Sequence, residues 1–132
     1  MSVTENDIAK IVVDAAFKTH TRIGPGLLES VYQAVLTYEL RQRGLKVVTE
    51  QPIPICYEAV ELDMAFRADL IVEDKLIVEL KSVEEFAPVH KKQLLTYLKL
   101  ADKRLGLLIN FGVALIKDGI LRVVNGLPEG QH

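Results

Sequence analysis

The chain has 132 residues and a mass of 14.8 kDa, enough for one hydrophobic core but not for two independent ones. Hydrophobic residues make up 49% and charged residues 26%, which argues against a disordered protein. A formal net charge of −2 argues against a protein that holds nucleic acid by bulk positive charge alone. We therefore expect a single globular domain over residues 1–132.

Nothing in the sequence points to an oxidising compartment or to a membrane. Cys56 is the single cysteine, so no intramolecular disulfide can form. The N-terminus lacks the basic and apolar runs of a signal peptide. The longest apolar run, residues 105–116, is shorter than the roughly 20 residues of a membrane-spanning helix. The expected location is the cytoplasm.

Two helices are expected first. Thr4 opens a Thr-x-x-Asp capping box, and apolar residues between Ile8 and Ala16 recur at helical spacing. Gly24-Pro25-Gly26 interrupts the chain. A second helix is then predicted from Leu27 to about Arg43, with Gly44 in the position of a C-terminal cap.

Strands follow the helices. The segment 47–57 has a β pattern, and Pro52 and Pro54 favour an edge position for it. The apolar runs 66–72 and 76–83 are separated by three residues, which predicts a tight antiparallel hairpin.

The last third of the chain predicts one more helix and two strands. Pro88 begins a helix that extends to about Ala101, and buried strands are expected at 105–111 and 120–124. The predicted order is α-α-β-β-β-α-β-β. The fold class is therefore α/β, with a mixed β-sheet flanked by helices.

Acidic residues within the apolar hairpin are the most informative feature. Side chains alternate along a strand, so Asp69 should share a face with Arg67 and Ile71, opposite a face formed by 66, 68, 70 and 72. On the next strand Glu79 and Lys81 share a face. The short turn places Asp69 within about one pair position of Glu79.

Two neighbouring carboxylates oppose each other's ionisation, and a divalent cation removes that cost. Oxygen ligands suit Mg²⁺ or Mn²⁺. Lys81 could hold an attacking water or stabilise developing charge. The alternative is a surface ion pair between Glu79 and Lys81, with Asp69 solvated.

Two helical patterns could extend this site. Glu29 lies in the first turn of the second helix, with Tyr32 three residues later on the same face, although a carboxylate there also favours the helix dipole. In the third helix His90, Gln93 and Tyr97 form a stripe that could face a phosphate or a base. Ordinary helix-surface residues would give the same pattern.

Other residues carry less information. His20 is expected to be structural, and Cys56 is expected to be a small buried hydrophobic side chain. Basic residues cluster in two places, which could follow a phosphate backbone or simply be solvated. These residues are Arg41, Arg43 and Lys46 in the first cluster and Lys91, Lys92, Lys99, Lys103 and Arg104 in the second.

Several motifs resemble a known family. Residues 26–32, Gly-Leu-Leu-Glu-Ser-Val-Tyr, match the pattern of the GxxExxY proteins. Segments 67–72, 78–81, 93–98 and 107–111 are also similar to that family, and the likeness extends from about Ile8 to Leu127. The family is placed in the PD-(D/E)xK nuclease-like superfamily, whose restriction-endonuclease-like core has the order α-β-β-β-α-β.

The resemblance implies a role for each matching residue. Asp69 takes the position of the metal-binding aspartate, Glu79 that of the second acidic ligand, and Lys81 that of the lysine. Glu29 corresponds to the acid on the first core helix, and Gln93 with Tyr97 to a QxxxY element. Ala68 stands where the superfamily motif has proline, a position that varies among its members.

The resulting hypothesis is a nuclease that uses Mg²⁺ or Mn²⁺ and acts on nucleic acid, with DNA as the favoured substrate. Asp69, Glu79, the Leu80 carbonyl and Glu29 would hold the metal, and Lys81 would orient the water. Gln93 would act in catalysis, whereas Tyr97, His90 and Tyr32 would position the substrate.

Two alternatives remain open at this stage. One is a nuclease-fold module without turnover that binds nucleic acid or a protein partner. The other is a metal hydrolase that acts on small phosphodiesters. A homodimer or a partner protein would fit the absence of room for a separate targeting domain.

Overall fold

A computed structural model of the chain describes residues 3–128. The elements are α1 (Glu5–Ile23), α2 (Glu29–Gln42), β1 (Val47–Tyr57), β2 (Val60–Val72), β3 (Leu76–Lys81), α3 (Pro88–Ala101), β4 (Leu105–Asn110), the 3₁₀ turn η1 (Ile116–Gly119) and β5 (Ile120–Val124). The order α-α-β-β-β-α-β-β is therefore confirmed, and no predicted element is missing from the described residues.

The strands form one mixed sheet in the order β1-β2-β3-β4-β5. Neighbouring strands are antiparallel except for β3 and β4, which are parallel because α3 connects them. As expected from its two prolines, β1 lies at an edge of the sheet. The α/β class predicted from the sequence is confirmed.

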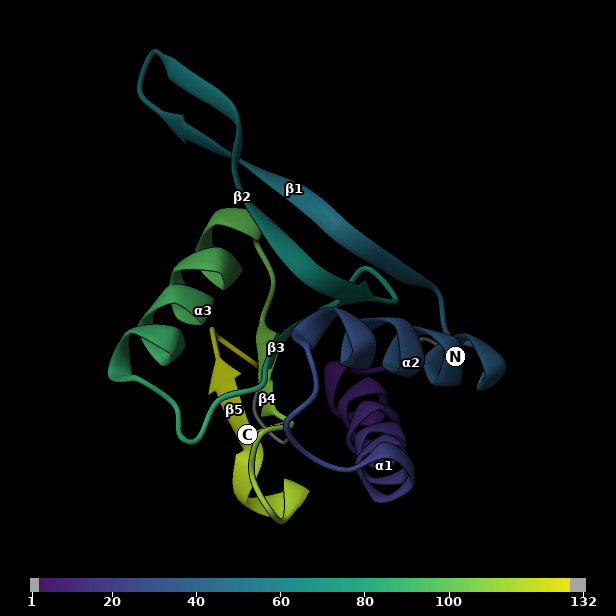
Figure 1. The fold of residues 1–132 in the computed structure, drawn as a ribbon. Helices are drawn as coiled ribbons and strands as arrows, with labels where there is room; N and C mark the ends of the chain where they lie inside the picture. Colours follow the sequence, from purple (N-terminus) through teal and green to yellow (C-terminus); the bar gives the residue numbers. More distant parts are fainter. Residues whose placement is uncertain (1–2, 129–132) are drawn as a thin grey trace.

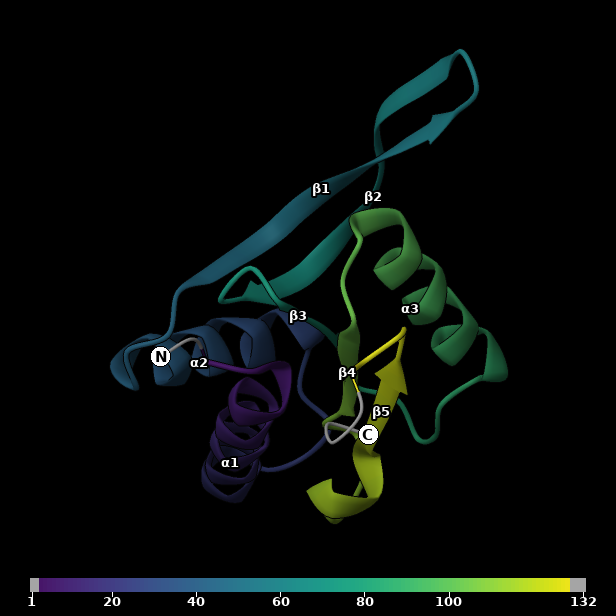
Figure 2. The same cartoon turned by 180° about the vertical axis from the view of Figure 1, so that it is seen from behind.

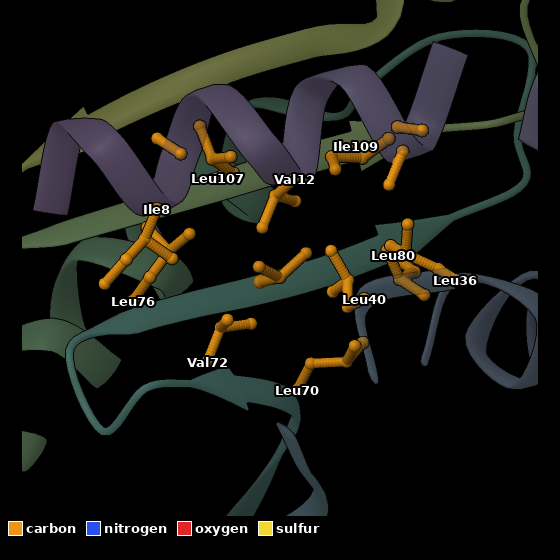
Figure 3. Packing of buried hydrophobic residues seen from close by; sticks show 14 of the residues in the cluster. Ile8, Val12, Leu36, Leu40, Leu70, Val72, Leu76, Leu80, Leu107 and Ile109 are labelled. Atoms are coloured by element: carbon orange, nitrogen blue, oxygen red, sulfur yellow. The ribbon is translucent and has the colours of Figure 1, made fainter. Parts of the chain in front are cut away.

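Helices cover both faces of this sheet. Figures 1 and 2 show α1 and α2 on one side of the strands and α3 on the other. The larger core lies beneath α1 and α2, where Ile8 and Val12 meet Leu36 and the strand residues Leu80 and Leu107 (Figure 3). The smaller core lies under α3. Its central members are Ile71, Ile77, Leu94, Leu98 and Leu108.

Local hydrogen bonds determine the residues at which the first two helices begin. Thr4 caps α1 through the predicted box, since its Oγ1 accepts the N–H of Asp7 at 3.1 Å. Helix α2 starts at Glu29, two residues after the predicted start at Leu27. The backbone N–H of Leu27 is bonded to the Tyr32 hydroxyl and its carbonyl accepts the Ser82 hydroxyl, so this segment is held as a loop.

Strands β1 and β2 extend beyond the rest of the sheet as a long hairpin (Figures 1 and 2). Strand β3 pairs with β2 only from Leu70 to Val72. Past that point the predicted alternation in β2 is wrong: Ala68 and Phe66 pack in the α3-side core, whereas Leu70 packs under α1 and α2. At this point the β1–β2 ladder skips Glu50 and Asp69, and Glu50 has a positive φ of 53°, so the regular alternation is interrupted.

Among the described residues, no helix is both long and apolar enough to span a membrane.

Candidate functional site

The acidic pair lies where β2 and β3 separate. The last pair of their ladder is Leu70 with Val78, so Asp69 and Glu79 face each other one position further on. There the side chains replace the ladder hydrogen bonds. The Leu80 N–H donates to Asp69 Oδ2 at 2.8 Å, and the Asp69 N–H donates to Glu79 Oε1 at 3.2 Å. The hairpin thus fixes both carboxyl groups in one place.

The electrostatics of this pair are unfavourable for two free carboxylates. Burial raises the pKa of Glu79 to about 9, and the charge of Asp69 and a hydrogen bond between the two carboxyl groups add to the increase. Burial also raises the pKa of Asp69, although the Leu80 N–H and the bond from Glu79 oppose that effect. The pair therefore keeps a proton at neutral pH, shared between the two groups.

Lys81 lies at the end of β3, two residues after Glu79, and is half-buried. Its positive charge lowers the pKa of both carboxyl groups, which places the ammonium within electrostatic reach of the pair. The Lys81 carbonyl accepts the Phe111 N–H at 2.8 Å, so β4 holds the backbone at this point.

A third carboxylate, Glu50, approaches from β1 and was not identified from the sequence. The register pairs Thr49 with Leu70 and Gln51 with Ala68, so Glu50 stands opposite Asp69. Its charge contributes to the raised pKa of Asp69. Its positive φ of 53° is a local signal of unusual backbone that only the structure provides.

Tyr97 forms one wall of the site from α3. Its ring stacks on Phe66 with centroids 3.6 Å apart and an interplanar angle of 12°. Burial raises the pKa of the Tyr97 phenol, and the charges of Glu79 and Asp69 raise it further. The phenol is thus close to the acidic pair. Gln93, one turn earlier on α3, is exposed.

His90 has a local role at the start of α3. Its Nδ1 accepts the Ala87 N–H at 3.2 Å, and its ring edge meets Phe86. The geometry gives this ring the function of a helix cap, and its predicted contact with substrate is left without structural support.

Tyr32, which was predicted to position the substrate, lies in the core of the protein. The ring is fully buried and stacks on Phe111 with centroids 4.3 Å apart. Its hydroxyl donates to the Gly24 carbonyl at 2.6 Å and accepts the Leu27 N–H at 3.0 Å. Tyr32 therefore closes the loop before α2. The first residue of that helix, Glu29, is exposed beside a hollow that Ser82 also lines.

Asn110 is a buried polar residue that the sequence did not single out. Its Oδ1 accepts the N–H groups of Val83 at 3.0 Å and Gly112 at 2.9 Å, which ties together the segments after β3 and β4. A Cβ at Gly112 would lie only 2.3 Å from the Val83 carbonyl, so only glycine permits this approach. The contact fixes the chain just beyond Lys81.

Two further expectations can be compared with the structure. His20 is buried with its Nε2 2.9 Å from the Val113 carbonyl, a structural contact. Cys56 is exposed near the tip of the β1–β2 hairpin, so its predicted burial is wrong. The hairpin leaves the core before it reaches this residue.

The two basic clusters differ in what they contact. In the first, Arg41 donates to the Val47 carbonyl at 2.9 Å, and Arg43 is paired with Asp14. In the second, Lys103 is paired with Asp74 at 3.1 Å. Lys91, Lys92 and Lys99 on α3 are exposed. The exposed basic row is thus concentrated on the helix that carries Tyr97.

Within residues 3–128, no three His, Cys, Asp or Glu side chains gather closely enough to hold a metal ion between them. In this part of the chain the carboxyl groups of Asp69 and Glu79 lie together, and Glu50 faces Asp69 from β1. Glu29 lines a separate hollow beside Ser82.

The mixed sheet with helices on both faces, and an acidic pair followed by a lysine at its centre, defines a restriction-endonuclease-like α/β protein. The model of the PD-(D/E)XK nuclease superfamily matches residues 6–123, and the chain belongs to this superfamily. Searches among curated proteins and among solved structures found no match.

Proposed function

We propose that the protein is a metal-dependent phosphodiesterase that cleaves nucleic acid, with DNA as the favoured substrate. The observation that carries this proposal is the close approach of half-buried Asp69 to buried Glu79, because two carboxyl groups held together at a cost in stability are typical of functional sites. Membership of the PD-(D/E)XK nuclease superfamily supports the same chemistry.

The donor set fits a hard divalent cation such as Mg²⁺ or Mn²⁺. Carboxylate oxygens are the ligands that these ions prefer, and a cation would replace the proton that the pair now shares. Asp69, Glu79 and the Leu80 carbonyl would hold the ion, and Glu29 is a further candidate ligand. When bound, the cation would polarise the phosphate and lower the pKa of a water molecule.

Side chains of the protein would orient the water, position the nucleic acid and neutralise its phosphates. Lys81 orients the attacking water in line with the leaving oxygen and offsets charge on the phosphate. Tyr97 and Gln93 position the strand that carries the reacting phosphate. The exposed row of Lys91, Lys92 and Lys99 neutralises neighbouring phosphates, which fits a protein whose overall charge is slightly negative.

Asp69→Asn is expected to abolish cleavage, because the amide removes a negative ligand while keeping an oxygen for the Leu80 N–H. The measurement is the release of fragments from linear, nicked and single-stranded DNA in Mg²⁺ or Mn²⁺. The matched control is Asp118→Asn, an exposed residue in η1 on the far side of the sheet from α3. Equal cleavage by wild type and Asp69→Asn would reject the proposal.

A second candidate is a nuclease-fold module that binds nucleic acid or a protein without turnover. It is favoured because, within residues 3–128, no three His, Cys, Asp or Glu side chains gather closely enough to hold a metal ion. The two candidates differ in one measurement. A binder without chemistry would retain DNA equally well after Glu79→Gln, and would release no fragments under any metal condition.

A further inference from the structure

The far part of the β1–β2 hairpin, which we call the arm (residues 54–63), has two different faces. The register pairs Tyr57 with Val60 and Ile55 with Leu62, so these four side chains share one face. Cys56 and Glu61 form a pair on the opposite face. The arm is thus an amphipathic ribbon, apolar on one side only.

The apolar face of the arm is largely uncovered. Tyr57 is 69% exposed, Val60 55% and Leu62 51%. Figures 1 and 2 show no helix over this part of the hairpin. A two-stranded ribbon has little stability in water without a surface to pack on. Exposed apolar side chains on such a ribbon indicate a contact with another molecule.

The charge of the arm excludes nucleic acid as the favoured occupant. Between Val47 and Phe66 the chain has four acidic residues and no lysine or arginine, and three of the acids lie in the arm. Those three are Glu58, Glu61 and Asp63. A phosphate backbone would be repelled by this surface, so its partner should be apolar with a positive rim.

A groove with these properties lies at the base of the same hairpin. It has a volume of about 370 Å³ and runs between β1 and the end of α3. Val48, Ile53 and Leu100 supply apolar lining. Lys46, Lys103 and Asp74 line it as well, and the pairing of Lys103 with Asp74 leaves one net positive charge. The groove therefore complements the arm in polarity and, through Lys46, in charge.

Arm and groove are consecutive parts of the same strand β1. Ile53 lines the groove, and the arm begins at Pro54, where the register of the β1–β2 ladder shifts. Strand β1 has 11 residues and spans about 35 Å. Two hairpins packed side by side in opposite directions would place each arm tip beside the groove of the other.

We propose that a second copy of this chain occupies the groove, so that two arms exchange across a two-fold axis. The four apolar side chains of one arm are too few for a stable interface, which needs about 20 residues a side. A two-fold arrangement uses arm and groove of each protomer and doubles the contact. Pro52 and Pro54 prevent simple strand addition, so side chains carry the association.

Light scattering during gel filtration tests this arrangement. Wild type should have twice the 14.8 kDa mass of one chain. Lys46→Glu in the groove and Glu58→Lys at the tip of the arm should each weaken self-association by about tenfold or more. An equimolar mixture of the two variants should form a dimer again. The acidic arm of the groove variant then meets the basic groove of the arm variant, and the basic arm of the arm variant meets the acidic groove of the groove variant.

The control is Lys117→Glu in η1, which should leave the dimer unchanged. Circular dichroism establishes that each variant is folded, and Tyr57→Ser gives a second route to the monomer if Lys46→Glu unfolds. A wild type that stays monomeric at high concentration would overturn the proposal and leave a different protein as the occupant. A dimer that persists in both charge-reversal variants would overturn it as well.

Discussion

Replacing Glu79 with glutamine is expected to stabilise the protein at pH 8 while removing cleavage. Burial and the charge of Asp69 raise the pKa of Glu79 to about 9, far above the ordinary value of 4.5. Glutamine keeps the oxygen that accepts the Asp69 N–H and supplies an N–H group for the Asp69 carboxylate. The variant should gain about 2 kcal/mol in the free energy of unfolding at pH 8.

The direction in which stability changes with pH follows from the number of protons that the folded and unfolded states bind. Between pH 4.5 and about 9 the folded protein keeps a proton on Glu79 that the unfolded chain has lost. The free energy of unfolding of the wild type should therefore fall as pH rises through this range, and that of Glu79→Gln should fall less. Urea unfolding at pH 5 and pH 8 measures both slopes. The control is Glu84→Gln, an exposed residue. Parallel slopes for wild type and Glu79→Gln would contradict the assignment.

Lys81→Met should lower the rate of cleavage by about 100-fold or more, because it removes the charge to which we assign the orientation of water and the offset of charge on the phosphate. The methionine keeps much of the apolar stem, so packing at the end of β3 should change little. Single-turnover cleavage of a labelled duplex measures the chemical step.

Lys117→Met, an exposed lysine in η1, is the matched control for this substitution and should cleave at the wild-type rate. Lys81→Arg should also be impaired, since a planar guanidinium does not occupy the position of an ammonium group. Full activity in Lys81→Met would assign water activation to another residue.

The sequence was sufficient to place the acidic pair because a short turn determines the register of a hairpin. Three residues between the two apolar runs place Asp69 within about one pair position of Glu79 by counting, and the observed register puts the two residues opposite each other. The same reasoning failed one strand further away. Glu50 reaches Asp69 only through the register of the long β1–β2 pair, and the start of that pair could not be read from the sequence.

Helical spacing was a weaker guide to exposure. Residues three apart share a helix face, but Glu29 is exposed and Tyr32 is fully buried, because the loop from Gly24 to Leu27 folds over the tyrosine hydroxyl. Spacing also cannot show that His90 caps its own helix. These differences arise from contacts between the helix and other segments of the chain. The spacing of apolar residues within a helix carries no information about such contacts.

Calorimetric titration of the protein with Mn²⁺, in buffers of different ionisation enthalpy, tests most directly whether the acidic pair is a metal site. The pair should bind the ion saturably and release about one proton at pH 7, because Glu79 must lose its proton to become a ligand. Binding should disappear in Asp69→Asn and persist in Asp118→Asn. Saturable binding that is equal in both variants, or no binding to the wild type, would contradict a metal site at Asp69 and Glu79.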